Sequence, residues 1–461
     1  MLQFIPEKLK KLAAVLPAPL YVVGGSVRDF LAGHARKQAD FSDWDVCAPV
    51  LPEVAAAAAK DCGFAVRSVY KNTGTVKLTD GAGTELEFSS FRSDEYVRGL
   101  HAPAKVYFTQ DIRADAERRD FTCNAVYFDI RGNRFADPLD GRKDIEEKRM
   151  RTVRDSRRVF GEDGLRLLRL ARQCGQLGFR ADGDTLRGAR ENAFLIRDIV
   201  SERIFAELEL ILHADEKYGV KDGHYRALRV LDETRVLDEI LPELTRGRGM
   251  AQPASFHAHD VLEHSLRCAL YAPGGIRWAA LLHDVGKPLC MLRDGNYHRH
   301  PEEGAALSDR ILTRLKAPKR LKEHTHALVL RHMYDMQCDT RERKLRRYFA
   351  ENFALLADLI ALKQADYSAC KDDLSPAPTV RRWREVLSRM HSEGAPFAER
   401  ELKITGKDLL DGGMPAQYVG KVLHGLLLHC AADPQDNRAD RLKGIAFGIY
   451  NDLLAAQARK G

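Results

Sequence analysis

Residues 20–31 read Leu-Tyr-Val-Val-Gly-Gly-Ser-Val-Arg-Asp-Phe-Leu, and this stretch predicts a strand, a glycine turn and a helix in direct succession. The apolar residues Leu20–Val23 are typical of a short strand, and Ser26–Leu31 of a helix. Gly24 and Gly25 let the backbone approach a ligand closely, and the free amides at a helix start can bind phosphate, beside the fixed cation of Arg28. A Gly-Gly turn by itself is common, so this interpretation needs support from other motifs of the chain.

A pair of carboxylates lies downstream in Asp43-Trp44-Asp45-Val46. If this segment is a strand, Asp43 and Asp45 share one face of it, because side chains alternate along a strand. Two carboxylates on one face can hold the divalent cations that an in-line phosphoryl transfer needs. Glu87 can supply a third carboxylate, although Glu85 lies on the same face of its strand and is an alternative. Taken alone, Asp-x-Asp is more often a polar loop.

Residues 117–125, Glu-Arg-Arg-Asp-Phe-Thr-Cys-Asn-Ala, gather two guanidinium groups, a carboxylate and an amide. Arg118 and Arg119 suit the phosphates of a nucleoside triphosphate, whereas Asp120 and Asn124 suit the hydroxyl groups of a ribose. A surface cluster of salt bridges is the alternative.

The motif Glu162-Asp163-Gly164-Leu165-Arg166 opens an amphipathic helix. Asp163 and Arg166 are three residues apart and are therefore predicted to be neighbours on one helix face. The alternative is an ordinary ion pair within a helix, worth only a few tenths of a kcal/mol.

The order of predicted elements indicates an α+β chain. Further strands are predicted over 44–47, 75–78, 86–89 and 125–130, and from Asp144 onward apolar residues recur at helical spacing. We therefore expect a mixed-sheet head over 1–140 and an all-helical remainder. Its expected parts are a neck over 141–220, a body over 221–400 with a second site at about 255–370, and a tail over 401–461.

In this order the four motifs resemble those of the tRNA nucleotidyltransferases, the CCA-adding enzymes that share a class with bacterial poly(A) polymerase. The match continues through Ser201-Glu202-Arg203-Ile204-Phe205-Ala206-Glu207-Leu208. The resemblance implies addition of CCA to a tRNA 3′ end from CTP and ATP without a nucleic-acid template. It also implies that residues 1–140 are a nucleotidyltransferase head, that the neck carries a base-reading helix and that the tail binds tRNA. It implies Asp43, Asp45 and Glu87 as catalytic residues, with Mg²⁺ on the two aspartates. The nucleotide-binding residues would be Gly24, Gly25, Ser26, Arg28, Arg118, Arg119, Asp120, Asn124, Asp163, Arg166, Arg169 and Arg172, and Asp163 and Arg166 would read the incoming base.

Three features depart from the family pattern. The spacer over 34–42 is a few residues longer than usual, and Gly164 stands where the family has Pro or Ala, at a cost of about 1 kcal/mol relative to Ala inside a helix. Residues 91–103 resemble the family's flexible loop for adding the terminal A, but its Asp-Gly-Arg-x-Pro core is degraded. Addition of CC only or of A only therefore stays open beside full CCA addition, as does poly(A) polymerase activity.

A second set of polar residues lies in the helical part, where an apolar stretch ends at His283-Asp284. A carboxylate is costly to bury unless it is paired or binds a metal, and imidazole with carboxylate suits Mn, Co, Ni or Fe. The pattern resembles an HD phosphohydrolase domain, active or purely structural. That resemblance implies His264, His283, Asp284 and Asp366 as metal ligands, with His300 and His332 on a second metal or a phosphate. A phosphohydrolase with an RNA-binding head is thus an alternative, as is a non-catalytic RNA-binding protein.

The composition sets limits on these interpretations. Hydrophobic residues make up 44% of the 461 residues, which excludes a disordered chain. The absence of an apolar run of about 18 residues and of a signal-peptide pattern predicts a cytoplasmic protein without a membrane partner. We expect a monomer or a homodimer. Nine single cysteines without a Cys-x-x-Cys pair indicate reduced thiols. The net charge of +7 is weak evidence for nucleic acid, unless it gathers into a patch for single-stranded tRNA ends.

Overall fold

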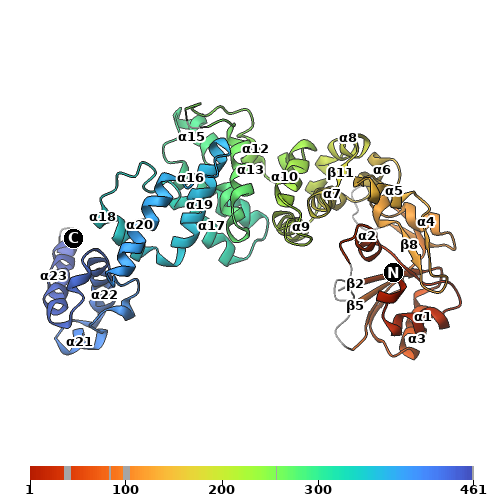
Figure 1. Ribbon diagram of the computed structural model, residues 1–461, viewed down its shortest axis with the longest axis horizontal. Helices are drawn as coiled ribbons and strands as arrows, with labels where there is room; N and C mark the ends of the chain where they lie inside the picture. Colours follow the sequence, from red (N-terminus) through yellow and green to blue (C-terminus); the bar gives the residue numbers. More distant parts are fainter. Residues whose placement is uncertain (36–42, 82–84, 97–103, 256, 459–461) are drawn as a thin grey trace. The chain divides into compact units, whose positions relative to one another are not determined.

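The computed structural model describes residues 1–35, 43–81, 85–96, 104–255 and 257–458, except for the side chain of Asp43. These residues form two compact units (Figure 1): Met1–Thr245 with Arg314–Ala317, and Arg246–Thr313 with Pro318–Gly461. No helix in the described ranges has both the length and the apolar character that crossing a membrane requires.

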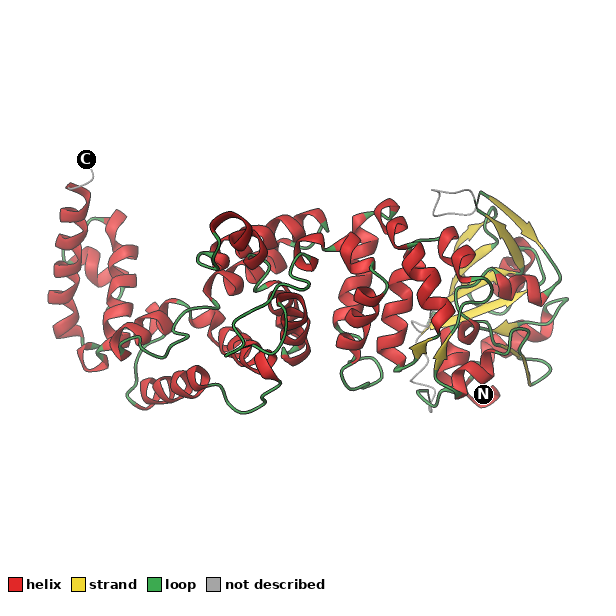
Figure 2. Ribbon diagram, turned by 90° about the horizontal axis from the view of Figure 1, so that it is seen from above, coloured by secondary structure: helices red, strands yellow, loops and turns green. Residues whose placement is uncertain are grey.

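The first unit is built on a seven-stranded mixed sheet of order β3-β4-β5-β2-β1-β8-β9. Within it, β2 and β5 are parallel, and the other neighbours are antiparallel. The strands are β1 (Tyr21–Val22), β2 (Asp43–Ala48), β3 (Ala65–Tyr70), β4 (Thr75–Thr79), β5 (Glu85–Ser90), β8 (Tyr127–Asp129) and β9 (Arg134–Ala136). Every strand in the described ranges belongs to this unit, as Figure 2 shows, so the predicted α+β class is confirmed.

Strand alternation gives this sheet one buried and one open face. Leu86 and Phe88 of β5 are buried, and the helix α3 (Pro52–Asp61) packs against β3, β4 and β5. Glu85 and Glu87 point to the opposite face and are exposed. The helix α2 (Gly25–Leu31) begins directly after the glycine turn and packs against β2. The sheet edge therefore presents carboxylates beside a helix start.

Short elements complete the head. They are α1 (Glu7–Val15), β6 (Arg92–Glu95), β7 (Lys105–Phe108), α4 (Ile112–Glu117) and α5 (Gly141–Glu146). The strands β6 and β7 pair with each other as a separate antiparallel ribbon. Residues 91–103 resemble the family's loop for adding the terminal A. Residues 97–103 of this segment lie outside the described part.

Helices follow the sheet within the same unit. The central one, α7, packs against α9 and α10, and Gly175 allows its close approach to α10, because a Cβ there would meet the Gly223 carbonyl oxygen at 2.4 Å. The helices are α6 (Ser156–Glu162), α7 (Leu165–Leu177), α8 (Gly183–Glu191), α9 (Ser201–Leu212), α10 (Gly223–Glu233), α11 (Val236–Ile240) and α12 (Pro242–Thr245). A further two-stranded sheet joins β10 (Arg149–Met150) to β11 (Arg180–Ala181).

Gly164 is not inside a helix, contrary to the prediction. The helix α6 ends at Glu162, Asp163 is extended with φ −149°, and α7 begins at Leu165 with Gly164 as its N-cap. A Cβ on Gly164 would lie 2.8 Å from the carbonyl oxygen of Leu195. Close packing therefore accounts for the glycine, and the helix-interior propensity cost does not apply.

The described residues of the second unit form helices joined by loops and contain no strand. The helix α13 packs against α14 and α19 around a buried polar cluster. The helices of the second unit are α13 (Val261–Tyr271), α14 (Arg277–Leu282), α15 (Lys287–Asp294), α16 (His300–Arg314), α17 (Lys319–Arg331), α18 (Glu342–Glu351), α19 (Phe353–Lys371), α20 (Pro378–Ser392), α21 (Gly406–Asp411), α22 (Ala416–Ala432) and α23 (Ala439–Ala458).

Candidate functional site

A polar cavity of about 760 Å³ lies in the first unit, between the carboxylate face of the sheet and the helix α7. Every residue predicted for the nucleotide site contributes to its lining except Asp43, whose side chain is outside the described part. The predicted residues that line it are Gly24, Gly25, Ser26, Arg28, Asp45, Glu87, Arg118, Arg119, Asp120, Asn124, Asp163, Arg166, Arg169 and Arg172. Residues more than 140 positions apart thus meet in one cavity.

The carboxylates come from the two parallel strands β2 and β5. Their register places Asp45 opposite Glu87 and Asp43 opposite Glu85. Glu87 lines the cavity, and among the described residues Glu85 is not part of the lining, so the geometry favours Glu87 as the third carboxylate. Gly24 has φ +76°, and a Cβ on it would lie 3.0 Å from Asp45 Oδ2. The turn therefore needs glycine both for its conformation and for its approach to the carboxylate.

Arg28 ties the glycine turn to the rest of the site. Its buried guanidinium donates from Nη1 to Asn124 Oδ1 at 2.7 Å and to Gln173 Oε1 at 3.2 Å, and from Nε to Asp29 Oδ1 at 2.8 Å. Burial opposes its charge, but Asp29, Cys123 and Tyr218 together outweigh burial and raise the pKa of Arg28 above its usual value. Arg28 thus links α2 to Asn124 and to α7.

Asp115 orients the two cavity arginines, and sequence reasoning missed it. The carboxylate is completely buried on α4 and pairs with Arg118 Nε at 2.7 Å and Arg119 Nη2 at 3.0 Å, and it accepts a 2.7 Å bond from the Tyr127 hydroxyl. Burial would raise the pKa of Asp115, but Arg119 and Arg118 outweigh it and lower the pKa to about 2. The available signal was its spacing of three and four residues before the two arginines.

If the cavity binds CTP and ATP, as the resemblance implies, Asp115→Asn should weaken this binding. The amide removes the charge that holds two guanidinium groups in place, so KM for CTP and ATP should rise about tenfold or more, with a smaller change in kcat. Steady-state incorporation into tRNA measures both constants. Asp111→Asn, at the exposed N-cap of the same helix, is the matched control and should behave like the wild type. A larger fall in kcat than rise in KM would contradict a positioning role.

Asp120 is paired across the cavity. Its Oδ1 accepts a 2.8 Å bond from Asn124 Nδ2, and its Oδ2 accepts one of 2.8 Å from Arg169 Nε. Burial works against ionisation, yet Arg169 and Asn124 hold the pKa of Asp120 well below its usual range. The predicted ribose-binding carboxylate is therefore charged and oriented by α7.

Asp163 and Arg166 face the same cavity but form no ion pair with each other among the described residues. Arg166 instead donates to the Val159 carbonyl oxygen at 2.9 Å, to Glu162 Oε2 at 3.1 Å and to the Arg118 carbonyl oxygen at 2.8 Å. Asp163 Oδ1 accepts from the Leu165 amide at 3.0 Å. Asp163 and Arg166 were predicted to be neighbours on one helix face. Because the helix is interrupted at Gly164, each side chain is instead held by its own contacts at the start of α7.

The second unit brings together the predicted HD residues. Nε2 of His264 lies 3.1 Å from Nε2 of His283 and 3.1 Å from Asp366 Oδ1, and Asp284 Oδ2 lies 3.4 and 3.3 Å from the same two nitrogens. All four side chains are buried. Two imidazole nitrogens facing each other between two carboxylates match the donor set of a divalent transition metal.

Asp284 also faces the other predicted histidines. Its Oδ1 lies 3.4 Å from His300 Nε2 and 3.8 Å from His332 Nε2, and these two nitrogens are 3.2 Å apart. Lys287, one turn on, ion-pairs with Asp284 Oδ2 at 2.6 Å. The two oxygens of Asp284 therefore serve two adjoining histidine pairs.

Comparison with known proteins agrees with this geometry. Residues 20–151 match the poly(A) polymerase head domain family, residues 178–247 the probable RNA- and SrmB-binding site of polymerase A, and residues 261–367 the HD domain. An A-adding tRNA nucleotidyltransferase of Deinococcus radiodurans is 31% identical over 451 residues, which are 92% of this chain and 95% of the relative. A multifunctional CCA protein of Teredinibacter turnerae is 29% identical over 333 residues, covering 68% of this chain and 74% of the relative.

Solved structures share the fold. A Bacillus stearothermophilus CCA-adding enzyme in complex with CTP is 22% identical, with a TM-score of 0.62 over 99% of this chain and 100% of that one. A Thermotoga maritima CCA-adding enzyme in complex with tRNA is 17% identical, with a TM-score of 0.62 over 97% of this chain and 94% of that one.

Proposed function

Because this chain belongs to the family of bacterial tRNA nucleotidyltransferases with an HD domain, we propose that it adds CCA to tRNA 3′ ends from CTP and ATP without a nucleic-acid template. The main support for the proposal is the cavity of the first unit. Carboxylates suited to binding Mg²⁺, several arginines, and both Asp163 and Arg166 line this cavity. In the reaction, the tRNA 3′-hydroxyl attacks the α-phosphorus of the nucleotide, and pyrophosphate leaves.

The residues of the cavity divide this work. Arg118 and Arg119, fixed by Asp115, bind the triphosphate, and the glycine turn lets the phosphates approach the backbone. The carboxylates of Asp43, Asp45 and Glu87 suit Mg²⁺, because this hard cation prefers oxygen ligands. When bound, Mg²⁺ lowers the pKa of the attacking hydroxyl and stabilises the leaving oxygen.

A-only addition is the second candidate, because the A-adding enzyme of D. radiodurans matches nearly the whole chain. One experiment separates the two. The protein is incubated with CTP, ATP, Mg²⁺ and a tRNA ending before CCA, after the first C or after the second C, and the products are sequenced. Completion of all three substrates supports CCA addition. Extension of only the third, by A, supports the alternative, and no extension of any substrate contradicts the whole proposal.

For the HD cluster we propose a phosphohydrolase centre that holds Mn²⁺, Co²⁺, Ni²⁺ or Fe²⁺. The ligands would be His264, His283, Asp284 and Asp366, and His300 and His332 would hold a second metal or the substrate phosphate. The metal would activate water for attack on phosphorus, and the alcohol of the ester would leave. Lys287 would neutralise charge on the phosphate.

We expect His283→Ala to abolish phosphodiesterase or phosphatase activity and to spare nucleotide addition, because the two clusters lie in different compact units. Hydrolysis is assayed with generic phosphate esters and each of the four metals, beside CMP and AMP incorporation. His298→Ala, an exposed histidine of the same unit, is the control. Loss of nucleotide addition in a folded His283→Ala protein would refute the two-site picture. Lack of hydrolysis in the wild type would make the HD domain a structural element.

A further inference from the structure

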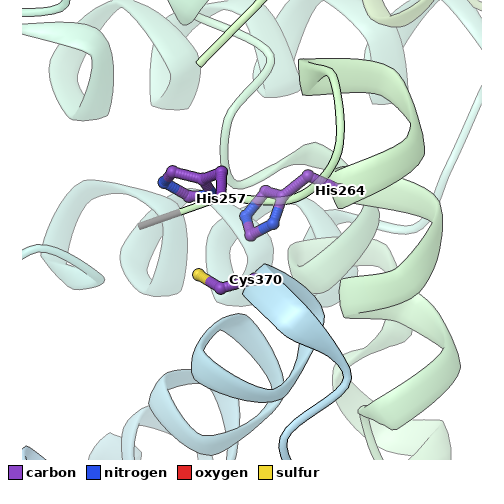
Figure 3. A group of neighbouring side chains, drawn as sticks. All are labelled: His257, His264 and Cys370. Carbon is purple, nitrogen blue, oxygen red and sulfur yellow. The ribbon is translucent and has the colours of Figure 1, made fainter. Parts of the chain in front are cut away.

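A third group of metal-ligand side chains adjoins the HD cluster (Figure 3) and consists of His257, His264 and Cys370. His257 lies in the loop before α13, His264 lies on α13, and Cys370 lies in the last turn of α19. One nitrogen of each imidazole and Sγ of Cys370 lie within 4.8 Å of one another. The group contains no carboxylate, which distinguishes its chemistry from that of the HD cluster.

His264 belongs to both groups, and its ring has two nitrogens that differ in their surroundings. Nε2 faces His283 and Asp366 in the HD cluster. Nδ1 is buried and has no hydrogen-bond partner among the described residues, and the same holds for Nδ1 of His257. Metal-binding histidines nearly always engage their second nitrogen as well, so a bare, fully buried Nδ1 calls for a partner.

The chain already places His257 beside Cys370. On one side of His257, the Ala258 amide donates a 2.8 Å bond to the Cys370 carbonyl oxygen. On the other side, Lys371 Nζ donates a 2.8 Å bond to the Ser255 carbonyl oxygen. Both contacts dock the loop onto the end of α19, and the rings of His257 and His264 meet edge to face with centroids 4.8 Å apart.

We propose that Sγ of Cys370, one imidazole nitrogen of His257 and Nδ1 of His264 form a zinc site next to the HD centre. A thiolate with two imidazoles is a donor set for Zn²⁺, and it disfavours hard cations such as Mg²⁺. Three protein ligands leave the fourth tetrahedral position to water. This inference goes beyond tRNA addition and depends on neither of the activities proposed above.

The geometry defines what binding requires. Zinc bonds of about 2.0–2.1 Å to nitrogen and about 2.3 Å to sulfur place tetrahedral ligand atoms roughly 3.3–3.8 Å apart. The ligand atoms of the group lie within 4.8 Å of one another, so metal binding requires only small inward shifts of the three side chains. The Cys370 thiol, which now donates to the Asp366 carbonyl oxygen at 3.4 Å, gives its proton to solvent. With both centres filled, Nε2 of His264 would serve the HD centre and Nδ1 the zinc, and the remaining ring proton would pass to solvent.

Cobalt tests the site because a thiolate ligand gives Co²⁺ a charge-transfer absorption that imidazole and carboxylate ligands do not. The metal-free full-length protein is titrated with Co²⁺, and zinc content is measured separately after dialysis against Zn²⁺. The wild type should show the thiolate band and one more zinc per chain than Cys370→Ser, which should lack the band. Cys338→Ser changes another half-buried cysteine of the same unit and should keep both signals. His283→Ala should keep the band while it empties the HD centre.

A second measurement needs no variant. Zinc bound by Cys370 should slow alkylation of this thiol about tenfold or more, read by peptide mass spectrometry, and leave the rate at Cys338 unchanged. His257→Ala should remove this protection. The proposal is overturned if the wild type shows no thiolate band, if the band survives in folded Cys370→Ser, or if zinc does not protect Cys370. None of these results would bear on nucleotide addition.

Discussion

Alanine in place of Asp45 should stop nucleotide addition and leave the fold intact. Asp45 faces Glu87 across parallel strands at the edge of the cavity, and its carboxylate lies beside Gly24. The alanine variant lacks a carboxylate suited to binding Mg²⁺. Electrostatic stabilisation of the transition state is expected to supply most of the rate acceleration in this reaction. We expect CMP and AMP incorporation to fall by about 10³-fold or more.

The same assay decides which glutamate completes the carboxylate set. Glu87→Gln should lose about 10²-fold or more, whereas Glu85→Gln should stay near the wild-type rate, because Glu87 lines the cavity and lies opposite Asp45. Asp43→Ala is expected to match Asp45→Ala on the basis of strand alternation. Asp61→Asn, at the end of α3 and exposed, is a neutral control. Circular dichroism and thermal unfolding confirm the fold of each variant.

Activity within tenfold of the wild type in Asp45→Ala at ordinary Mg²⁺ would end the metal assignment. Full activity in Glu87→Gln together with loss in Glu85→Gln would exchange the two glutamates. Either result would leave the family membership untouched, since that rests on the comparisons.

The sequence predicts well what local alternation and motif order control. Trp44 and Val46 are buried while Asp45 is exposed, so the structure places Asp45 on the open face of its strand, as the alternation predicts. The strand β3 was not predicted from the sequence. Its residues are mostly exposed, and its apolar and polar side chains do not alternate clearly. The α+β class depends on strand alternation and on the order of the elements, and it was therefore predictable.

What escaped prediction depends on contacts between distant segments. Gly164 is required because a Cβ there would collide with the carbonyl oxygen of Leu195, which is 31 residues away. Helix propensity, a local property, cannot predict this contact. The role of Asp115 depends on its burial beside Tyr127, and the partner of Arg166 is Glu162 because α6 ends there. The histidines of the HD pattern were predictable by resemblance, whereas the grouping of His257 with Cys370 arises only when α13 and α19 pack together.

The largest expected change in specificity concerns how protein replaces a nucleic-acid template. Cytosine and adenine each present an amine donor beside a ring-nitrogen acceptor, whereas uracil and guanine present a carbonyl acceptor beside an N–H donor. A carboxylate only accepts and a guanidinium only donates. Asp163 accepting from the amine, with Arg166 donating to the ring nitrogen, therefore fits C and A and opposes U and G.

The contacts at the start of α7 leave part of each side chain available for this task. Asp163 Oδ1 is occupied by the Leu165 amide, so Oδ2 is left for the base amine. The Nη atoms of Arg166 hold Val159, Glu162 and Arg118, so Nε and one remaining Nη2 hydrogen are left for the ring nitrogen. These bonds fix Arg166 before a nucleotide arrives, and a mismatched base cannot turn it away without breaking them.

We expect Asp163→Asn to raise the use of UTP and GTP relative to CTP and ATP about tenfold or more, because an amide can donate to the carbonyl that a carboxylate repels. Arg166→Ala should lose both rate and discrimination. The exchange Asp163→Arg with Arg166→Asp should favour UTP and GTP further, although it sets a carboxylate against Glu162 and needs a check of folding. Single-turnover incorporation with each of the four nucleotides measures selectivity, and Asp155→Asn, an exposed N-cap of α6, is the control. Unchanged selectivity in folded Asp163→Asn and Arg166→Ala would remove this pair from base recognition, because an ordinary surface pair affects stability and not the choice among bases.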